Sequence, residues 1–311
     1  MRVATSHFDL AVLGADDPLG EAFLRLLEER EMAIGKLYPL TLNDVEETVA
    51  FAGQDWPCLT EAEFDYGQAQ ALVVATRATV AGNYAANAIA VRPTLPVVGL
   101  NQIDPAPAVA VARVLRVIDA LAGVQGAEAF VALSVAQMGK VGVDELSNQT
   151  RGLFNLDAPD PEVFPLQIAF NLMPLPDQDY DTSLAETTQR LLDQPVAVGF
   201  SCVQAPLFFG AATILHVRTR EGVDLATLRL ALTRTDGITL MESELPAGIP
   251  TPATDAAESD DVFIGRIQQR SDTAGGHLKF WLVFDPLRLE AAQLAAAVEN
   301  WIDKPANSML T

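Results

Sequence analysis

The sequence predicts an α/β protein made of two domains, and two observations lead to this prediction. Residues 1–125 alternate short apolar runs with helical patterns, which is typical of a parallel sheet covered by helices on both faces. From residue 126 onward, strand-like segments become longer and helical segments fewer. We therefore expect a parallel-sheet domain over 1–125 and an α+β domain over 126–285, followed by a last helix.

The beginning of the chain predicts the first half of a βαβ unit. The apolar run 8–13 is followed by a turn that is flanked by Gly14 and Gly20, and a helical pattern with one apolar face begins at Leu19. The same domain is expected to hold two further strands, 71–75 and 96–100, and two further helices, 79–90 and 108–122.

The second domain is predicted to combine strands of mixed polarity with amphipathic helices. Asp224 is a good N-cap for the helix that follows it. The segment 164–172 is expected to be extended, the bulky cluster 207–209 is suited to core packing, and 174–182 and 246–261 are expected to be loops. The predicted strands are 129–135, 196–203, 213–219, 262–267 and 278–284, and the predicted helices are 141–154, 183–192, 225–232 and 286–302.

The charge balance excludes two classes of partner. Twenty Lys and Arg residues against 41 Asp and Glu residues give a formal net charge of -21. Nucleic acid and anionic membrane surfaces would repel such a chain, so we expect neither as a partner. A phosphate-bearing ligand stays compatible with this charge, because it needs only a local basic or amide-rich pocket.

Export and metal binding are not expected either. No stretch reaches the roughly 18 consecutive apolar residues of a membrane span, and residues 1–7 lack the apolar core of a signal peptide, so we expect a cytoplasmic protein. Cys58 and Cys202 are too few for a disulfide framework. No metal site is predicted, because no ligand spacing joins the three histidines His7, His216 and His277.

Four blocks of the sequence resemble the aspartate-semialdehyde dehydrogenase family, and most closely its Usg-type paralogues. They occur in the family's order with plausible spacing, and the resemblance is strong over 126–302 but holds only in outline before it. The blocks are 139–150 (GKVGVDELSNQT), 164–171 (FPLQIAFN), 202–210 (CVQAPLFFG) and 259–267 (SDDVFIGRI).

The resemblance implies a fold, an assembly and a reaction. The fold would be a Rossmann-like, dinucleotide-binding type of domain over 1–125, completed by the C-terminal helix within 286–311, and a dimerisation and substrate domain over 126–285. The assembly would be a homodimer. In the reaction, a cysteine thiolate attacks an aldehyde, hydride passes to NADP and phosphate resolves the thioester, with a histidine base nearby and an arginine that grips the substrate carboxylate.

The residues that this chemistry requires are replaced. By the resemblance, Ala106 occupies the place of the nucleophilic cysteine, Gln204 that of the carboxylate-binding arginine and Ala211 that of the histidine. An alanine cannot form a thiohemiacetal. A neutral amide cannot replace the charged guanidinium group of arginine, which binds a carboxylate through two hydrogen bonds. We therefore predict that no residue is catalytic at these three positions.

The phosphate-binding turn is altered too. The family's G-A-T-G-x-V-G keeps Gly14 and Gly20, but Asp16 and Asp17 replace its threonine and its middle glycine. Two carboxylates at a helix N-terminus stabilise the helix dipole and repel an anionic ligand. No basic residue follows 38–40, where the family handles the 2′-phosphate of NADP. The two glycines are thus a weak remnant of a cofactor site, and we expect no cofactor, or NADP if any.

Two basic residues survive at positions that are similar to the family's. Lys140 and Arg266 are candidates for the remnant of an anion pocket, although an ion pair with Asp144 or Glu145 is an equally good interpretation of their role.

Three functions follow from the sequence. The first is a catalytically inactive homodimer that retains the scaffold for binding a small metabolite or a protein. The second is an active NADP-dependent semialdehyde dehydrogenase of amino-acid biosynthesis, which would need Cys58 or Cys202 in a rearranged active site. The third is a sensor that binds a metabolite anion in the former substrate cleft.

Overall fold

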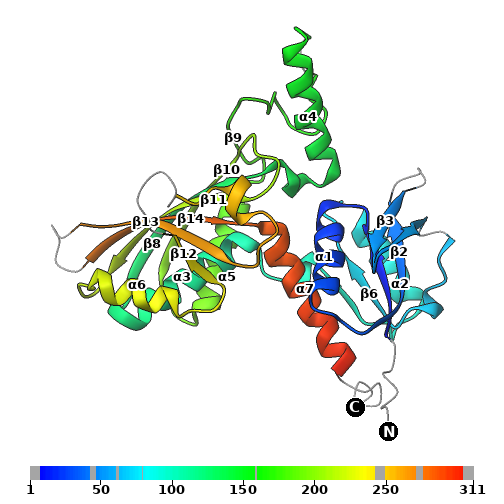
Figure 1. Cartoon of the computed structure of the whole chain (residues 1–311), viewed down its shortest axis with the longest axis horizontal. Coiled ribbons are helices and arrows are strands. Elements are labelled where there is room, and N and C mark those ends of the chain that lie inside the picture. Colours follow the sequence, from blue (N-terminus) through cyan, green and yellow to red (C-terminus); the bar gives the residue numbers. More distant parts are fainter. Residues whose placement is uncertain are drawn as a thin grey trace. The chain divides into compact units, whose positions relative to one another are not determined.

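In the computed structural model the chain folds into two compact units, which Figure 1 shows with their helices and strands labelled. Unit 1 comprises Met1–Asp104 and Glu290–Thr311, and unit 2 comprises Pro105–Leu289. His7 and the first part of the predicted loop 246–261 lie outside the described residues. The structure describes residues 8–42, 47–60, 63–78, 80–157, 160–241, 249–270 and 276–303.

Unit 1 is built on a five-stranded parallel sheet with the strand order β5-β2-β1-β6-β7. The four residues Leu10 to Leu13 of the central strand are all fully buried, as expected for a strand that is covered on both faces. This sheet confirms the predicted fold class for the first part of the chain. Its strands are β1 (Phe8–Leu13), β2 (Ile34–Thr41), β5 (Leu59–Thr60), β6 (Ala71–Val74) and β7 (Val97–Gly99), and β3 (Thr48–Phe51) pairs with β4 (Gln54–Pro57) as a separate antiparallel hairpin.

Two helices of unit 1 follow strands of this sheet, as βα units require. α1 (Pro18–Glu29) buries the predicted apolar face, including Phe23, and α2 (Ala81–Val91) follows β6. Glu290 of α7 (Pro286–Asp303) forms an ion pair with Arg77, within the same unit. None of the described helices is long and apolar enough to span a membrane.

The two glycines of the β1–α1 turn have packing roles. Gly14 has a φ of +76°, a conformation that L side chains rarely adopt. A Cβ atom on Gly20 would lie 2.0 Å from the Gly14 carbonyl oxygen, so only glycine lets α1 start this close to the turn. Both positions therefore require glycine for the fold itself.

Unit 2 is built on a seven-stranded mixed sheet with the strand order β12-β13-β14-β11-β8-β10-β9. β8 pairs in parallel with β10 and antiparallel with β11, and β11 pairs antiparallel with β14. This mixed sheet confirms the predicted α+β class of the second part. The strands are β8 (Val124–Leu133), β9 (Met173–Pro174), β10 (Ala197–Gln204), β11 (Ala211–Thr219), β12 (Ile238–Leu240), β13 (Val262–Arg270) and β14 (Gly276–Phe284).

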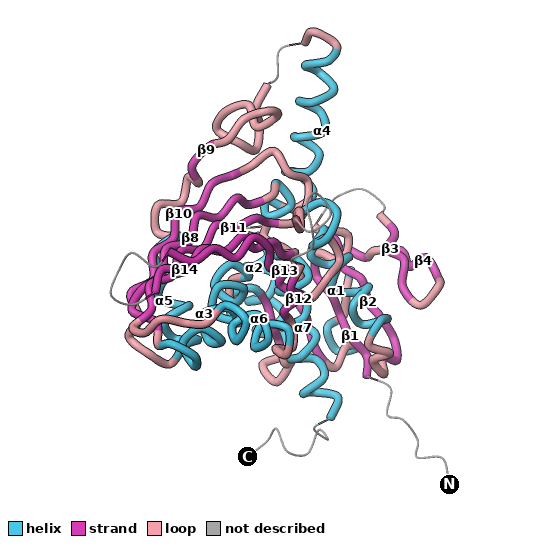
Figure 2. Tube along the Cα trace, turned by 60° about the vertical axis from the view of Figure 1, so that its left-hand side comes forward, coloured by secondary structure: helices cyan, strands magenta, loops and turns pink. Residues whose placement is uncertain are grey.

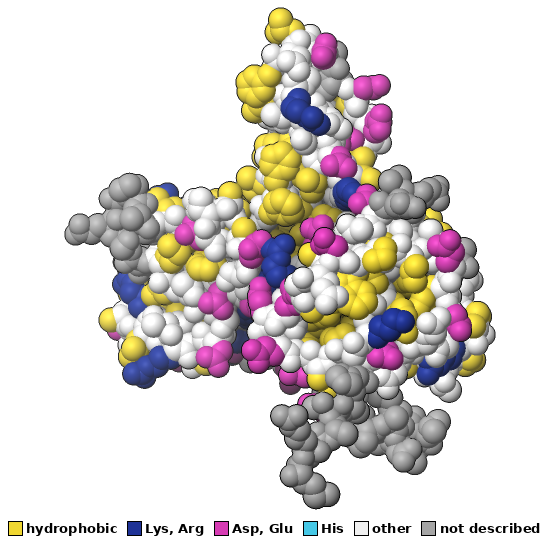
Figure 3. Space-filling model, turned by 45° about the vertical axis from the view of Figure 1, so that its right-hand side comes forward, with side chains coloured by type: hydrophobic (Ala, Val, Ile, Leu, Met, Phe, Trp, Pro, Cys, Tyr) yellow, Lys and Arg dark blue, Asp and Glu magenta, His cyan; other side chains and the backbone are white. Residues whose placement is uncertain are grey.

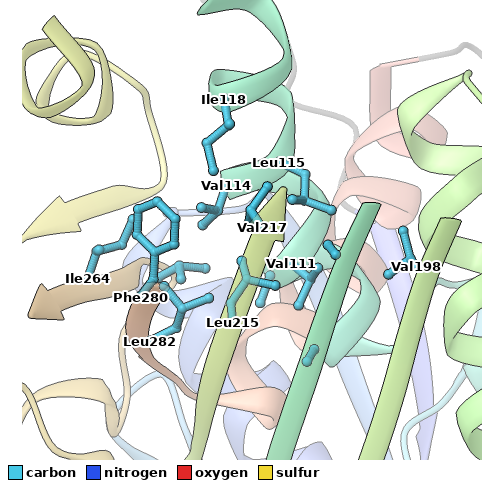
Figure 4. Packing of buried hydrophobic residues seen from close by; sticks show 14 of the residues in the cluster. Val111, Val114, Leu115, Ile118, Val198, Leu215, Val217, Ile264, Phe280 and Leu282 are labelled. Atoms are coloured by element: carbon cyan, nitrogen blue, oxygen red, sulfur yellow. The ribbon is translucent and has the colours of Figure 1, made fainter. Parts of the chain in front are cut away.

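Three helices pack on one face of this sheet and form the core of unit 2. They are α3 (Ala106–Ala122), α5 (Tyr180–Leu192) and α6 (Leu225–Thr233). The predicted N-cap of α6 is present, because Asp224 accepts a hydrogen bond from the Thr227 backbone N–H at 2.8 Å. Figure 4 shows the apolar side of α3 above the sheet, with Val111, Val114, Leu115 and Ile118 near Leu215, Val217, Phe280 and Leu282.

The position of α3 follows from these contacts. The sequence predicts that this helix belongs to the 1–125 domain, at the end of the βα alternation. In the structure its buried side chains belong to the same apolar cluster as the inward side chains of β8, β11 and β14. The helix is accordingly grouped with unit 2, which begins at Pro105.

α4 (Lys140–Phe154) and the segment 160–174 extend away from the sheet (Figures 1 and 2). The prediction that 164–172 is extended was wrong, since most of it forms bends and turns. Its backbone is instead fixed by α4: Glu145 Oε1 accepts from the Phe164 N–H at 3.3 Å, and Gln149 Oε1 accepts from the N–H groups of Ile168 and Ala169 at 2.8 and 3.1 Å. Figure 3 shows hydrophobic side chains on this projecting part, and Phe154 and Phe170 are 78% and 69% exposed.

The apolar cluster 207–209 does not pack in the core, contrary to the prediction. Phe208 and Phe209 are each 42% exposed. They lie in the turn between β10 and β11, where the carbonyl groups of Leu207 and Phe208 accept hydrogen bonds from the N–H groups of Val135 and Ala136. The backbone of this turn is therefore fixed while its aromatic side chains point outward.

Replacing Gly20 by alanine is expected to lower the free energy of unfolding by about 2 kcal/mol or more, because the new methyl group would overlap the backbone of the β1–α1 turn. Gly82→Ala is the matched control, since nothing lies within 4 Å of a Cβ at that position in α2. The control should be neutral or more stable by up to about 1 kcal/mol. Urea unfolding of both variants measures the difference, and equal stability of Gly20→Ala and wild type would contradict the packing role.

Candidate functional site

The turn between β1 and α1 is held by the carboxylates of Asp16 and Asp17. The Thr41 hydroxyl at the end of β2 donates to Asp16 Oδ2 at 2.8 Å, and the Thr76 hydroxyl after β6 donates to Asp17 Oδ2. Asp16 is 9% exposed. Both acids thus connect the turn to the ends of the two neighbouring strands, which is where an α/β sheet holds an anionic ligand.

Backbone N–H groups of the same turn are also used within the protein. The Gly14 and Ala15 N–H groups donate to the Leu40 carbonyl oxygen at 2.8 and 3.2 Å, and the Asp17 N–H donates to the Gly14 carbonyl at 3.1 Å. A phosphate at this turn would have to compete with these carbonyl oxygens and approach two carboxylates. The residues present therefore do not fit a dinucleotide pyrophosphate.

Ala106 is the first residue of α3 and is fully buried. It belongs to the apolar core cluster of unit 2. Its neighbour Pro105 takes the N-cap position without a side-chain hydrogen bond to the helix. A helix N-terminus lowers the pKa of a thiol, and α3 is 17 residues long. The methyl group of Ala106 has no proton that could ionise there.

The two other positions at which the sequence predicts a missing catalytic residue are buried as well. Gln204, at the end of β10, is 2% exposed and donates from Nε2 to the Leu133 carbonyl oxygen at 3.0 Å. Ala211, at the start of β11, is fully buried after Gly210, which has a φ of +78°. The side-chain amide of Gln204 therefore forms a hydrogen bond with the backbone of the neighbouring strand β8.

The two thiols lie in different units and have unreactive surroundings. Cys58 follows β4 in unit 1, and burial, with the charges of Asp16 and Glu47, raises its pKa to about 12. Cys202 is buried in β10, where burial and then Asp181 raise its pKa. Neither thiol would be ionised near neutral pH.

The described histidines do not lie beside Cys202. The Cys202 side chain belongs to the apolar cluster on the helix-covered face of the sheet. His216 and His277 contact each other, and the alternation of side chains along β11 and β14 places them on the opposite face. A cysteine–histidine pair is therefore not formed by the residues that the structure describes in unit 2.

The two surviving basic residues are found in separate surroundings. Lys140 is the first residue of α4, whereas Arg266 lies at a β-bulge in β13 with a φ of +50°. Arg266 lines a cavity of about 180 Å³ together with Lys279 and Trp281, and Lys140 does not line it. Glu145, one of the two carboxylates considered as a partner, accepts from backbone N–H groups of the 162–164 segment.

Several polar residues with structural roles could not be predicted from the sequence. Thr41 and Thr76 lie 25 and 59 residues from the aspartates that they contact, so no local pattern could have indicated them. Among the described residues, buried polar atoms without a hydrogen-bond partner include the Ser134 and Thr213 hydroxyls and the Gln137 amide nitrogen. A bound water or ligand could supply the missing hydrogen-bond partners of these atoms.

Alkylation with iodoacetamide at about pH 8 should modify Cys58 in the native protein at least about a hundredfold more slowly than in the urea-unfolded chain, because the raised pKa removes the thiolate. Since the pKa is raised, the rate should keep climbing as the pH increases above about 9. A Cys202→Ser variant isolates the Cys58 signal, and peptide mass spectrometry measures it. Equal rates in the native and unfolded chains would show that Cys58 is accessible as a thiolate.

Comparison with known proteins agrees with this fold. Residues 117–289 match the family model for the semialdehyde dehydrogenase dimerisation domain. The chain is 28% identical to an aspartate-semialdehyde dehydrogenase of Legionella pneumophila over 96% of both chains, and 30% identical to a USG-1 protein homolog of Azotobacter vinelandii over 92% of this chain and 96% of that one.

A solved structure shows the same likeness. The crystal structure of aspartate semialdehyde dehydrogenase II from Vibrio cholerae, complexed with ASA, superposes with a TM-score of 0.79 at 26% identity, over 95% of this chain and 99% of that one. Both the sequence match and the structural match extend over nearly the whole length. This chain belongs to the aspartate-semialdehyde dehydrogenase family.

Proposed function

We propose that this protein is a homodimeric member of the family that has lost the dehydrogenase reaction and retains the scaffold for a binding or interaction role. The observation that carries the proposal is Ala106, a fully buried methyl group at the first turn of α3, where the resemblance implies the nucleophile. Without sulfur at this position, no thioester can form there.

Four further residues support the same proposal. Gln204 and Ala211 stand where the resemblance implies a carboxylate-binding arginine and a base. Both are buried, and Gln204 donates to a backbone carbonyl group of β8. The thiols of Cys58 and Cys202 have raised pKa values, so neither offers a substitute nucleophile at neutral pH.

We also propose that the protein does not use NADP. The crystal structure of aspartate semialdehyde dehydrogenase from Candida albicans is a structure with NADP. That enzyme is 14% identical to this chain, so the likeness between the two extends to the fold alone. In the present chain Asp16 and Asp17 lie at the N-terminus of α1, each bound by a threonine hydroxyl. Their negative charges and hydrogen bonds disfavour a pyrophosphate at this turn.

The homodimer is supported by the domain that the family model describes. The match over 117–289 includes every strand of the seven-stranded sheet, and the model is that of a dimerisation domain. We propose that this role persists although the reactive residues do not, because the sheet is intact.

Purified protein mixed with aspartate semialdehyde, phosphate and NADP is expected to form no NADPH above the rate of a protein-free control. The physical reason is that the hydride donor, a thiohemiacetal, cannot form at Ala106. Absorbance at the NADPH band measures this, with an active family dehydrogenase in a parallel reaction as the positive control. Steady turnover that disappears in Cys58→Ser or Cys202→Ser would overturn the proposal and identify the replacement nucleophile.

NADP at millimolar concentration is expected to leave the thermal unfolding of the wild-type protein unchanged, whereas a ligand at about 100 times its dissociation constant would add about 2.7 kcal/mol. The double variant Asp16→Thr/Asp17→Gly should bind NADP at least about tenfold more tightly than wild type, because two repulsive charges are removed. Glu29→Gln, which removes one charge from the far end of α1, is the matched control. A clear wild-type shift with NADP would contradict the proposed exclusion.

A further inference from the structure

A cavity of about 180 Å³ lies on the face of the seven-stranded sheet that points away from α3. Strand pairing places Ile214 of β11 beside Trp281 of β14. Side-chain alternation directs Ile214, Lys279 and Trp281 away from the core cluster, which contains Phe280 and the α3 side chains. The sheet therefore separates this cavity from Ala106, which belongs to that cluster. The lining residues are Ile214, Arg266, Gln268, Lys279, Phe280 and Trp281.

A β-bulge in β13 brings Arg266 to this cavity. Between the pairs Gly265–Trp281 and Gln268–Lys279, β13 holds two residues where β14 holds one. The first of the two is Arg266, with a φ of +50°. L side chains rarely adopt this conformation, and bulges redirect a side chain. Residues that are held in such strain gather at sites that grip a ligand, so the bulge is a reason to examine what Arg266 could bind.

The two cations that line the cavity have no carboxylate partner. Neither Arg266 nor Lys279 forms an ion pair with a residue that the structure describes. Glu128 lies in the same row of the sheet as Lys279, but His216 separates them. The Glu128 carboxylate points toward the opposite neighbour, since a Cβ on Gly199 of β10 would lie 2.2 Å from Glu128 Oε2. An anion in the cavity would therefore reduce the repulsion between two like charges.

The rest of the lining is an amide and an apolar wall. The indole N–H of Trp281 donates to the Pro250 carbonyl oxygen at 2.7 Å, so the ring is held in place and its donor is already used. Ile214 lies beside it. The Gln268 side chain, opposite Lys279, has an amide N–H₂ that can donate to an anion. The lining thus suits a ligand with a charged end and an apolar end.

We propose that this cavity binds a small phosphate monoester, with the phosphate between Arg266 and Lys279 and the organic group against Trp281 and Ile214. A phosphate carries two charges on one group and offers acceptor oxygens to both a guanidinium and an ammonium group. The cavity is smaller than the roughly 300 Å³ of a drug-sized site, so the ligand is small. The site goes beyond the proposed loss of the reaction, because it lies on the other face of the sheet.

The overall charge makes this cavity selective for its anion. The chain has a formal net charge of -21, so its surface as a whole repels phosphate. Only a local group of cations can offset that repulsion, and Arg266 and Lys279 supply one. Lys140, the other basic residue that the sequence indicates for an anion pocket, does not line this cavity.

The site is tested by isothermal titration of the full chain with phenyl phosphate at about pH 7.5, where the phosphate is mainly a dianion. One molecule should bind per chain. Arg266→Gln and Lys279→Gln should each weaken binding at least about tenfold, because each removes a charge-assisted hydrogen bond. Arg218→Gln is the matched control: it removes the same charge from the same face of β11 but does not line the cavity. It should change the affinity by no more than about twofold.

Two further probes test the ligand class. Benzoate carries a single charge, and inorganic phosphate lacks the ring. Each should bind at least about tenfold more weakly than phenyl phosphate, because one loses a charge and the other loses the apolar contact with Trp281. Benzoate that binds as tightly as phenyl phosphate would contradict the phosphate assignment. Inorganic phosphate that binds as tightly would contradict the apolar half of the site.

Arg266→Gly separates binding from folding. Glycine adopts a φ of +50° without strain, so this variant should unfold at the same temperature as Arg266→Gln or a higher one. It should nevertheless bind phenyl phosphate as weakly as Arg266→Gln does. A lower unfolding temperature for Arg266→Gly than for Arg266→Gln would contradict the account of Arg266 as a strained anion ligand.

The remaining outcomes concern the site as a whole. A folded wild-type chain that does not bind phenyl phosphate would overturn the proposal. Binding that persists in the double variant Arg266→Gln/Lys279→Gln would place the anion elsewhere and overturn it as well. Neither outcome bears on the proposed loss of the dehydrogenase reaction, which the assay with aspartate semialdehyde and NADP tests separately.

Discussion

The fully buried methyl group of Ala106 at the start of α3 is the constraint on which the proposed loss of the reaction depends. A helix N-terminus lowers the pKa of a thiol, and the fold still presents such a terminus here. What the position lacks is an atom to ionise. The helix, the sheet beneath it and the apolar cluster between them are all retained. The structure thus keeps this helix and sheet around a first helical residue that has no ionisable group.

The polar side chains of the turn and of Gln204 form hydrogen bonds within the protein. Gln204 donates to a β8 carbonyl group, and Asp16 and Asp17 accept from Thr41 and Thr76. Buried polar groups need such partners, since an unsatisfied one costs about 1–3 kcal/mol. Stability thus favours keeping these internal hydrogen bonds over opening the turn to a phosphate.

The sequence was sufficient for the local features and insufficient for the distant ones. The N-cap at Asp224 could be predicted, because a single side chain and the following helix determine it. The segment 164–172 could not, because α4 residues Glu145 and Gln149 bind its backbone in place of a neighbouring strand. The hydrophobicity of Phe208 likewise predicts a core residue, but Phe208 lies in a turn where its side chain is 42% exposed. The contact of Thr76 with Asp17 depends on the parallel order of β1 and β6, which no local pattern contains.

Intact-mass spectrometry of the protein after incubation with aspartate semialdehyde and NADP, without phosphate, tests the loss of the nucleophile most directly. A working family enzyme would stop at the acyl-enzyme under this condition, because phosphate is needed to release it. We predict an unmodified mass for wild type, and for Cys58→Ser and Cys202→Ser as well. A single acyl adduct on the wild-type chain, lost in one of these two variants, would contradict the proposal.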